Sequence, residues 1–582
     1  DIATFRDFPA EMRAAAGRLP GVSALQHRFS SFDIHTPGDA PDVLVAMNPA
    51  ALKVHLGALK RDGILILNTA SFKPLDLKKA KWERDPREDG SLEGYRVIEV
   101  DLTERTREAL ANSPLDNRAR DRCKNMYALG ILYWLFHRDV EPTEKAIAKK
   151  FAKKPDIVEA NLTAMRAGHA YAETTEIFQT AYRVPAAKLP PGTYRNIMGN
   201  QALCLGLVAA SQRCGVPLFL GSYPITPASD VLHQLSTYKH HGVITFQAED
   251  EIAAVCAAIG ASYTGLLGVT STSGPGVALK SEAMGLAVMA ELPLIVLDIQ
   301  RAGPSTGMPT KTQQADLLQV MYGRNGESPV VVLACSTPAD AFEVGYEAVR
   351  IATKYMVPVV VLSDGYIANG SEPWRLPDVE ALPPVEVTFA PPGQPDVKFQ
   401  PYARDPKTLA RPWAKPGTPG LVHRIGGLEK QDVTGNISYD PDNHQHMVDT
   451  RARKVANVAA DLPPLETIGE RQGDVLVLGW GSPRGAITAA TMRLQKQGHR
   501  ISCAFLRHLN PLPNDLEALM RGFRRVVLPE LNKGQLAMML RARFLIDVES
   551  YSQVNGQPFK SQDIEDHLKN VLAGTAAKEG GR

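Results

Sequence analysis

Glycine, proline, serine and threonine are concentrated in three short motifs that could bind a ligand. They are residues 223–227 (Y-P-I-T-P), 270–276 (T-S-T-S-G-P-G) and 300–312 (Q-R-A-G-P-S-T-G-M-P-T-K-T). Tight strand-to-loop turns of this composition direct backbone N–H groups and hydroxyls at one spot. In an open α/β sheet that spot is the crevice outside the carboxyl ends of the strands. Ordinary turn chemistry explains any one motif, but three in one αβ-alternating segment predict a ligand site.

Of four charged residues near these motifs, Glu251 and Arg301 are candidates for catalysis or binding. Glu251 begins the apolar run 251–260, and a helix there would carry its carboxylate into a buried site. Glu249 and Asp250 are instead typical of acids that complement the dipole of a helix N-terminus. Arg301 follows an apolar strand pattern and precedes a Gly-Pro turn. Its guanidinium could bind a carboxylate with two hydrogen bonds and stabilise developing charge, or could form a structural salt bridge.

Alternating apolar and amphipathic segments predict the elements that position these residues. The pattern indicates a buried α/β unit over about residues 199–364. Its strands are expected at residues 218–220, 243–246, 268–270, 293–298, 330–334 and 358–362. Helices are expected between them, among others at residues 229–238, 250–264 and 281–291.

The chain before this unit also alternates strand and helix patterns. Strands are expected at residues 42–48 and 63–68, a helix at 50–59 and a helical region at about 121–182. The basic run 145–154 is expected to be a solvated helix face. A Pro-rich linker follows at residues 184–193.

After this unit, residues 366–465 have little periodicity and many prolines and glycines. An irregular stretch of that length is usually functional or wraps another subunit. The last region predicts a strand at 474–478, a helix at 486–497 and a strand at 500–506. Its glycine turn, residues 479–485, is one residue longer than the dinucleotide fingerprint and no ribose-binding acid follows the second strand, so NAD is not expected.

Composition limits the class of protein. The chain has 582 residues, 44% of them hydrophobic and 22% charged, as in a soluble globular protein of several domains. With 65 basic and 63 acidic residues, a net charge of +2 favours neither nucleic acid nor membrane partners. The six cysteines form no C-x-x-C pair. Neither a disulfide framework nor a zinc or iron–sulfur site is therefore expected, and a cytoplasmic location fits best.

At these motifs the chain resembles the α subunit of 2-oxoacid:ferredoxin oxidoreductases, with that family's γ domain fused in front. Y-P-I-T-P, Q-A-E-D-E (247–251), T-S-G-P-G and Q-R-A-G-P-S-T-G-M-P-T carry the α-type resemblance, together with residues 506–513 and 529–535. Residues 9–13 and 36–48 carry the γ-type resemblance. A γ domain normally opens with a strand and a glycine-rich loop that are absent before Asp1, so we expect the N-terminus to be truncated.

The resemblance covers essentially the whole chain and implies several open α/β domains. The expected order is a γ-type domain at 1–185, a linker at 186–198, a pyrimidine-type thiamine diphosphate domain at 199–385, an extended irregular segment at 386–465 and a transketolase C-terminal-like domain at 466–582.

The resemblance also implies thiamine diphosphate, the electron sink for the acyl carbanion left when a 2-oxoacid loses CO2. Glu251 matches the carboxylate that hydrogen-bonds the aminopyrimidine ring and helps to form the ylide. Thr226 matches a threonine at the reacting centre, and Arg301 the group that holds the substrate carboxylate. The other implied cofactor contacts are Pro224, Ile225, Ser273 and Gly274, and the other implied substrate contacts are Ser305, Thr306 and Thr310.

Parts of such an enzyme are absent from this sequence. It contains no G-D-G motif for the diphosphate and Mg2+, and no cysteine set for a 4Fe-4S cluster. We therefore expect no metal ligand in this chain and a β subunit that brings these groups, in an (αβ)2 heterotetramer. For the phosphates of coenzyme A the sequence offers Arg13, Ser482, Arg484 and Arg507, although the glycine turn could equally be a tight connection.

The resemblance, with the γ–α fusion and the S-T-G-M-P-T context, implies the α subunit of a 2-oxoglutarate:ferredoxin oxidoreductase (2-oxoglutarate synthase). The implied reaction converts 2-oxoglutarate, coenzyme A and oxidised ferredoxin into succinyl-CoA, CO2 and reduced ferredoxin, reversibly in carbon-fixing cycles such as the reductive TCA cycle. Alternatives are an enzyme for pyruvate or branched-chain 2-oxoacids, a non-redox thiamine enzyme of transketolase type, and a non-catalytic assembly subunit.

Overall fold

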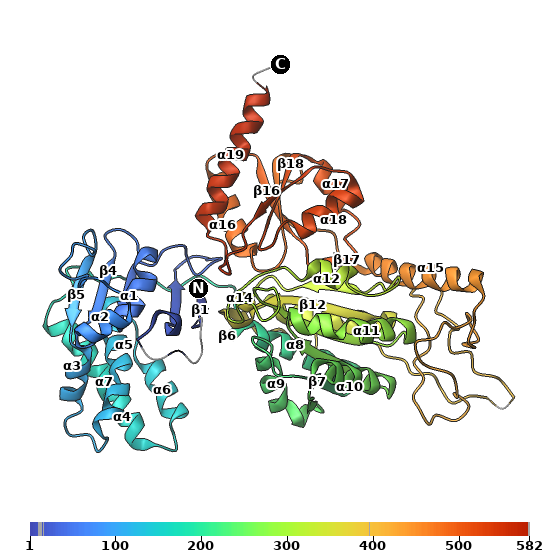
Figure 1. Cartoon of the computed structure of the whole chain (residues 1–582), viewed down its shortest axis with the longest axis horizontal. Coiled ribbons are helices and arrows are strands. Elements are labelled where there is room, and N and C mark those ends of the chain that lie inside the picture. Colours follow the sequence, from blue (N-terminus) through green and yellow to red (C-terminus); the bar gives the residue numbers. More distant parts are fainter. Residues whose placement is uncertain (10–13, 15–16, 395, 580–582) are drawn as a thin grey trace. The chain divides into compact units, whose positions relative to one another are not determined.

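The computed structural model describes residues 1–9, 14, 17–394 and 396–579. It divides into two compact units (Figure 1). The first contains residue 1, residues 7–34 and residues 38–190, and the second contains residues 2–6, 35–37 and 191–582. No helix among the described residues is long and apolar enough to cross a membrane.

The first unit is built on a sheet of three parallel strands in the order β3-β4-β5. The strands are β3 (Val43–Ala46), β4 (Ile64–Asn68) and β5 (Arg96–Val100). Every residue of the central strand β4 is buried, which explains its uninterrupted apolar sequence. The predicted strands at 42–48 and 63–68 are confirmed. The unit also contains β2 (Ala24–Phe29), α1 (Pro49–His55), α2 (Pro74–Lys79), α3 (Leu102–Ala109), α4 (Asn117–Arg122), α5 (Lys124–Leu135), α6 (Glu141–Lys150) and α7 (Pro155–Thr174).

Helices α5 and α7 cross with their backbones in close approach. A Cβ atom on Gly130 would lie 2.0 Å from the carbonyl oxygen of Met165, and one on Gly168 would lie 2.0 Å from that of Tyr127. Only glycine permits this separation, so these two positions determine the crossing. The predicted helical region is confirmed, and the lysines of the basic run 145–154 are exposed as expected.

The second unit is built on a seven-stranded sheet in the order β17-β11-β12-β10-β9-β7-β8. Strands β7 to β12 pair in parallel, and only β17 is antiparallel to its neighbour. The six predicted strands of this unit are confirmed, because each overlaps a strand of the sheet. The strands are β7 (Leu218–Ser222), β8 (Ile244–Gln247), β9 (Leu267–Thr272), β10 (Leu294–Gln300), β11 (Val331–Ala334), β12 (Pro358–Asp364) and β17 (His508–Asn510).

Two helical layers cover this sheet, each with its own core. One core joins the sheet to α8 (Gly199–Cys214), α9 (Ser229–Leu235) and α13 (Asp340–Tyr355). The other joins it to α10 (Glu251–Tyr263), α11 (Gly274–Ala290) and α12 (Leu317–Tyr322), and extends to the C-terminal sheet. Strand residues alternate between the two cores, as in β10, where Leu294 and Val296 face one and Ile295 and Leu297 the other.

The motif T-S-T-S-G-P-G is a strand-to-helix turn, not the predicted strand-to-loop turn. Thr270 to Thr272 complete β9, Ser273 is the N-cap of α11, and Gly274 to Gly276 form the first helical turn. The expected start of this helix at residue 281 is therefore wrong. Pro275 stands in the first turn, where its missing N–H removes no intrahelical hydrogen bond.

The segment that follows the seven-stranded sheet is irregular only in part. Strand β13 (Ser371–Arg375) pairs with β6 (Tyr194–Met198), and α14 (Gly365–Asn369) precedes it. The expected irregular segment 386–465 is wrong from residue 441 on, because α15 (Pro441–Asn457) is a 17-residue helix. Asp440 caps it by accepting a hydrogen bond from the N–H of Asn443 at 2.7 Å, a start signal that the Pro- and Gly-rich composition concealed.

The C-terminal part forms a five-stranded sheet in the order β14-β16-β15-β18-β19. The predicted strands at 474–478 and 500–506 and the helix between them are confirmed. The elements are β14 (Thr467–Ile468), β15 (Gly473–Gly479), β16 (Ile501–Phe505), β18 (Phe523–Glu530), β19 (Val548–Ser552), α16 (Arg484–Lys496), α17 (Leu516–Arg521), α18 (Gln535–Phe544) and α19 (Ser561–Glu579). Several open, mainly parallel α/β sheets are therefore present, which is the expected fold class.

Candidate active site

The three motifs meet at the carboxyl edge of the seven-stranded sheet. Strands β7, β9 and β10 are adjacent, with Ser222 opposite Ser271 and Asp298 opposite Thr272. These strands end at Ser222, Thr272 and Gln300, directly before the first motif and within the other two. Because parallel strands end at the same edge, the sheet brings the motifs together as the sequence predicts.

Glu251 is the first residue of α10 and is 8% exposed. The side chain of Asp250 caps this helix by accepting a hydrogen bond from the N–H of Ala253 at 2.7 Å, which is the helix-start role expected of it. Glu249 and Asp250 are exposed. Glu251 is therefore the acid of this group that the fold buries.

A glycine on the neighbouring helix makes room for Glu251. A Cβ atom at Gly276 would lie 2.8 Å from Cγ of Glu251 and 1.9 Å from Oγ1 of Thr272. Any larger residue would displace one of these side chains. The last glycine of T-S-G-P-G thus packs the N-terminal ends of α10 and α11 against each other.

Lys280, which the sequence did not single out, is fully buried beside Glu251. Its Nζ donates a hydrogen bond to the carbonyl oxygen of Glu251 at 2.9 Å. Burial lowers the pKa of Lys280 to about 8, and the charges of Glu251 and Asp250 oppose this shift. A lysine six residues into an apolar helix stretch was the available signal, since lysine is rarely buried without a role.

Arg301 is buried next to the Y-P-I-T-P loop. Its Nη1 donates to the carbonyl oxygen of Thr226 at 2.8 Å, and its Nε has no hydrogen-bond partner among the described residues. Burial lowers the pKa of the guanidinium, while the charges of Asp316 and Glu251 raise it. A buried guanidinium with unused N–H donors can bind an anionic ligand.

The carboxyl groups of the buried Asp298 and the half-buried Asp316 interact with each other, and neither was predicted from the sequence. Burial raises the pKa of Asp298 well above its ordinary value, and raises that of Asp316 to about 6, while Arg301 lowers the latter. As carboxylates they have no donor between them, and neither oxygen of Asp298 has a partner among the described residues. A proton on Asp298 supplies the donor for a hydrogen bond to Asp316.

The loop after Arg301 folds back on itself. The N–H of Met308 donates to the carbonyl oxygen of Ala302 at 2.8 Å. Gly307 has φ 50°, and a Cβ atom there would lie 2.0 Å from the same oxygen, so the turn requires glycine. Ser305 and Thr306 are exposed on this loop, and Thr310 is half-buried where it rejoins the body of the unit.

The expected cofactor contacts differ in accessibility. Pro224 and Thr226 are exposed and Ile225 is half-buried in the loop after β7. Ser273 is fully buried with an Oγ that has no partner among the described residues. Gly274 packs against Asp316, whose carboxylate oxygen would lie 2.6 Å from a Cβ atom at that position.

The residues expected to bind coenzyme A are largely engaged in internal contacts. Arg507 pairs with Asp340 at 2.5 Å, and Arg484 donates to Oγ of Ser336 at 3.1 Å. Ser482 is buried beside Asp364. Arg13 lies outside the described residues. No group of three or more His, Cys, Asp or Glu side chains that could hold a metal ion occurs in the described part of the chain.

Family profiles and individual relatives all place the chain in one family. Residues 210–439 match the profile of pyruvate flavodoxin/ferredoxin oxidoreductases described as thiamine diphosphate-binding, and residues 1–171 match that of pyruvate ferredoxin/flavodoxin oxidoreductases. The chain is 54% identical over 580 residues, 99% of its length and 88% of the relative's, to 2-oxoglutarate oxidoreductase subunit KorA of Mycobacterium tuberculosis.

More distant relatives and a solved structure agree with this match. Subunit alpha of 2-oxoacid:ferredoxin oxidoreductase 2 from Aeropyrum pernix is 29% identical over 93% of this chain and 84% of the relative. The structure of 2-oxoglutarate:ferredoxin oxidoreductase from Magnetococcus marinus with 2-oxoglutarate, coenzyme A and succinyl-CoA bound matches 98% of this chain and 94% of its own, with 31% identity and a TM-score of 0.84.

Proposed function

The chain belongs to the 2-oxoacid:ferredoxin oxidoreductase family, and from this membership we propose that it is the α subunit of a 2-oxoglutarate:ferredoxin oxidoreductase. In the proposed reaction, 2-oxoglutarate loses CO2, its succinyl group passes to the thiol of coenzyme A, and two electrons pass to ferredoxin. The main support for 2-oxoglutarate as the substrate is the 54% identity to a 2-oxoglutarate oxidoreductase subunit over nearly the whole chain. The Magnetococcus marinus structure, solved with 2-oxoglutarate and coenzyme A, supports it.

The residues present fit one half of a thiamine diphosphate site. Glu251 is buried at the sheet edge, Ser273 offers an unused hydroxyl, and Gly276 keeps the space beside Glu251 small. We propose that these residues, with Pro224, Ile225, Thr226 and Gly274, hold the aminopyrimidine half. When bound, this group supplies the electron sink for the carbanion formed on decarboxylation.

We assign Glu251 the exchange of a proton with the aminopyrimidine ring. Its carboxylate lies in a largely dry site, where hydrogen bonds to a ring nitrogen are stronger than in water. Lys280 holds the carbonyl group of Glu251 and places a positive charge beside its carboxylate. Lys280 is thus a positioning residue that keeps the first turn of α10 in place.

Arg301 is proposed to bind the 1-carboxylate of the 2-oxoacid. Its hydrogen bond to the Thr226 carbonyl uses one donor and fixes the guanidinium against the Y-P-I-T-P loop. The remaining donors can hold a carboxylate and stabilise the charge that develops as CO2 leaves. Ser305, Thr306 and Thr310, on the loop that follows, are proposed to contact the rest of the substrate.

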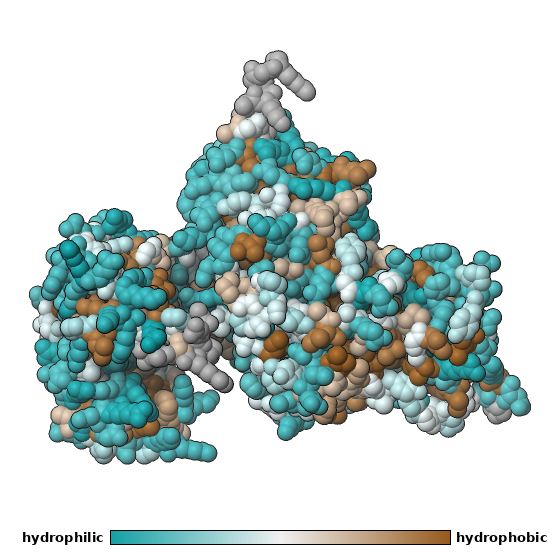
Figure 2. Space-filling view, viewed as in Figure 1, coloured by the Kyte–Doolittle hydropathy of each residue, from teal (hydrophilic) through white to brown (hydrophobic). Residues whose placement is uncertain are grey.

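A β subunit is proposed to complete the enzyme. The sequence has no G-D-G motif for the diphosphate and Mg2+, and no cysteine set for a 4Fe-4S cluster. Exposed apolar side chains, including Ile244 and Phe246 on the sheet edge β8, Ile252 on α10 and Leu279 on α11, offer a surface for such a subunit. Figure 2 shows hydrophobic patches over the part of the molecule that Figure 1 labels α10 and α11. We propose an (αβ)2 assembly, and a cytoplasmic location because all six cysteines are free.

For coenzyme A we propose Arg484 and Arg507, with Ser482 in the glycine turn between β15 and α16. Their contacts with Asp340 and Ser336 place both guanidinium groups near the turn after β11. The double variant Arg484→Ala/Arg507→Ala should raise the Michaelis constant for coenzyme A. An unchanged constant would remove this assignment.

The decisive test is a substrate panel with the co-purified α and β chains. We expect reduction of a viologen dye to require coenzyme A and to be fastest with 2-oxoglutarate, compared with pyruvate and a branched-chain 2-oxoacid. A preference for another 2-oxoacid would assign the chain to that branch of the family. Activity without an electron acceptor or bound iron would indicate a non-redox enzyme of transketolase type.

A matched pair of variants tests the role of Glu251. Glu251→Gln keeps the shape but removes the charge, so turnover should fall about 10²- to 10⁴-fold for every 2-oxoacid. Glu249→Gln, the exposed neighbour, should retain activity. Full activity in Glu251→Gln would contradict the assignment, and would leave an assembly role as the alternative. The α chain alone should bind neither iron nor thiamine diphosphate tightly.

A further inference from the structure

A second site is indicated by Arg411, in the irregular segment before α15. The residue is 3% exposed, and none of its three guanidinium nitrogens has a hydrogen-bond partner among the described residues. Its Cζ lies 5.4 Å from the ring centroid of the buried Tyr402. A buried guanidinium with no anion is unfavourable, because the ring face replaces little of its lost hydration.

The charges around Arg411 do not neutralise it. Lys430 and Lys454, both nearly fully buried, are close enough for the charge of Arg411 to lower their pKa values, in addition to the larger effect of burial. The nearby carboxylates are engaged elsewhere: Glu291 with Arg404 and Lys454, and Glu429 with Arg451. The region therefore carries positive charge that a ligand could neutralise.

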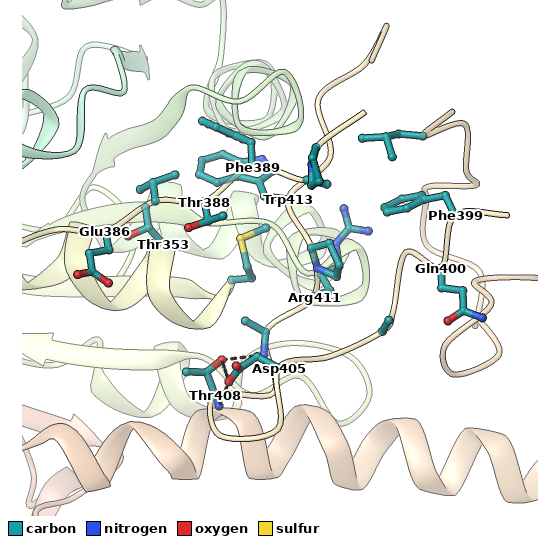
Figure 3. A pocket seen from close by; sticks show the side chains of 18 of the residues that line it. Thr353, Glu386, Thr388, Phe389, Phe399, Gln400, Asp405, Thr408, Arg411 and Trp413 are labelled. Carbon is teal, nitrogen blue, oxygen red and sulfur yellow. Dashed lines mark hydrogen bonds between the residues drawn. The ribbon is translucent and has the colours of Figure 1, made fainter. Parts of the chain in front are cut away.

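A cavity of about 1050 Å³ adjoins Arg411. Figure 3 shows Arg411 extending between the Phe389–Trp413 pair on one side and Phe399 on the other. The wall combines aromatic, aliphatic and proline side chains with polar ones such as Gln400 and Thr388. Its other charged members are three cations and two carboxylates: Arg350, Lys354, Lys398, Glu386 and Asp405. A volume of this size, with an aromatic and aliphatic wall interrupted by polar groups, is typical of a small-molecule site.

The aromatic wall is fixed to the body of the unit. The indole Nε1 of Trp413 donates to the carbonyl oxygen of Ser262 at 3.0 Å. Phe389 packs on Trp413 with ring centroids 4.8 Å apart, and Nζ of Lys415 lies 3.6 Å from the Phe389 centroid. These contacts hold the cavity open as a preformed site, anchored on the C-terminal end of α10.

We propose that Arg411 and this cavity bind a small organic anion, a carboxylate or phosphate carried on an apolar or aromatic body. The guanidinium fork would hold the anionic group with two hydrogen bonds, and the aromatic wall would cover the body. None of the lining residues belongs to the candidate active site, so the proposal is independent of the reaction. An acidic side chain from another subunit is the other conceivable occupant, but the volume favours a whole molecule.

The test uses the purified complex of this chain with its β subunit. Benzoate and phenyl phosphate carry the two anionic groups on the same ring, and benzyl alcohol is the neutral control. We expect one molecule of at least one anion to bind per α chain by calorimetry, quenching tryptophan fluorescence, and no binding of benzyl alcohol. The anion that binds more tightly shows whether the site prefers a carboxylate or a phosphate.

Variants then locate the site. Arg411→Met should weaken binding by about 10- to 100-fold, the loss of a charged hydrogen-bonded pair, and Arg411→Lys less. Arg424→Met, an exposed arginine of the same segment, should bind as the wild type does. Without ligand, Arg411→Met should melt no lower than wild type, because it removes an uncompensated charge. Binding that survives Arg411→Met, no binding of either anion, or dissociation of the β subunit in Arg411→Met would each overturn the proposal.

Discussion

The two ends of helix α11 bury charge in opposite ways. At its C-terminal end Glu291 is 1% exposed and accepts from Arg404 at 2.6 and 2.5 Å and from Lys454. Although burial raises the pKa of Glu291, the two cations hold it at about 2. Toward the N-terminal end Lys280, Arg301 and Asp298 are buried and Asp316 is half-buried, with few partners each.

This difference distinguishes charges that stabilise the fold from charges that can bind a ligand. Arg404 belongs to the irregular segment and Lys454 to α15, so the Glu291 cluster fastens both to the helix. The Glu291 carboxylate already accepts from two cations, so it gains nothing from a ligand. At the other end, hydrogen-bond donors are unused and pKa values are shifted, as is common for groups that bind a ligand or take part in a reaction. Incomplete pairing, rather than burial itself, marks the candidate site.

The largest effect is expected from breaking the complete cluster. Glu291→Gln leaves Lys454 buried without an anion and Arg404 with only Asp432, 3.6 Å away, which should cost about 3–5 kcal/mol of stability. Thermal unfolding of the α chain should show a clear fall in Tm. Glu282→Gln, an exposed acid on the same helix, is the control. An unchanged Tm in Glu291→Gln would show that these ion pairs do not stabilise the packing of the irregular segment and α15 on α11.

At the opposite end, Lys280→Met should spare the fold and damage the reaction. Burial already disfavours the ammonium, so Met should not lower Tm, but losing the hydrogen bond and charge beside Glu251 should reduce turnover about 10- to 100-fold. Because the pKa of Lys280 is about 8, wild-type turnover should decline as the pH rises through 8. The turnover of the Lys280→Met variant should not show this decline with pH. A lower Tm with normal turnover would instead indicate a purely structural lysine.

Asp298→Asn should change how stability depends on pH. The pKa of Asp298 is raised well above its ordinary value and that of Asp316 to about 6. An acid with a higher pKa in the folded than in the unfolded state stabilises the fold at low pH. That contribution is lost as the pH rises from about 4 through the raised pKa of Asp298. Asn donates its N–H to Asp316 without titrating.

The measurement is Tm between pH 4 and pH 8. The variant should match wild type at the acidic end and exceed it increasingly toward neutral pH. Asp230→Asn, an exposed acid of the same unit, should give a constant difference. Parallel curves for wild type and Asp298→Asn would show that the two carboxyls do not share a proton.

The smallest effect is expected from Thr310→Ala. Losing one hydroxyl from a half-buried loop position changes pocket contacts without touching the cofactor residues, so the ratio of activities with 2-oxoglutarate and pyruvate should shift several-fold. Equal changes with both substrates would remove Thr310 from substrate choice.

The sequence alone determined the sheet and the motifs at its edge. Apolar runs such as 293–298 and 358–362 predict buried strands because both faces are covered, and their order placed Glu251, Arg301 and Thr226 near one another. Helix starts were less certain. The composition of residues 270–276 and 440–443 is shared by loops and capped helices, so α11 and α15 began where loops were expected.

Only the tertiary structure decided which charges are buried and what each one faces. Nothing in the sequence pairs Glu291 with Arg404, 113 residues away, or places Lys280 against the Glu251 carbonyl. Local sequence determines element type, because backbone preferences act over a few residues. The partners of a buried charge depend on how distant elements pack, which is why Lys280, Asp298, Asp316 and Arg411 became visible only in the folded chain.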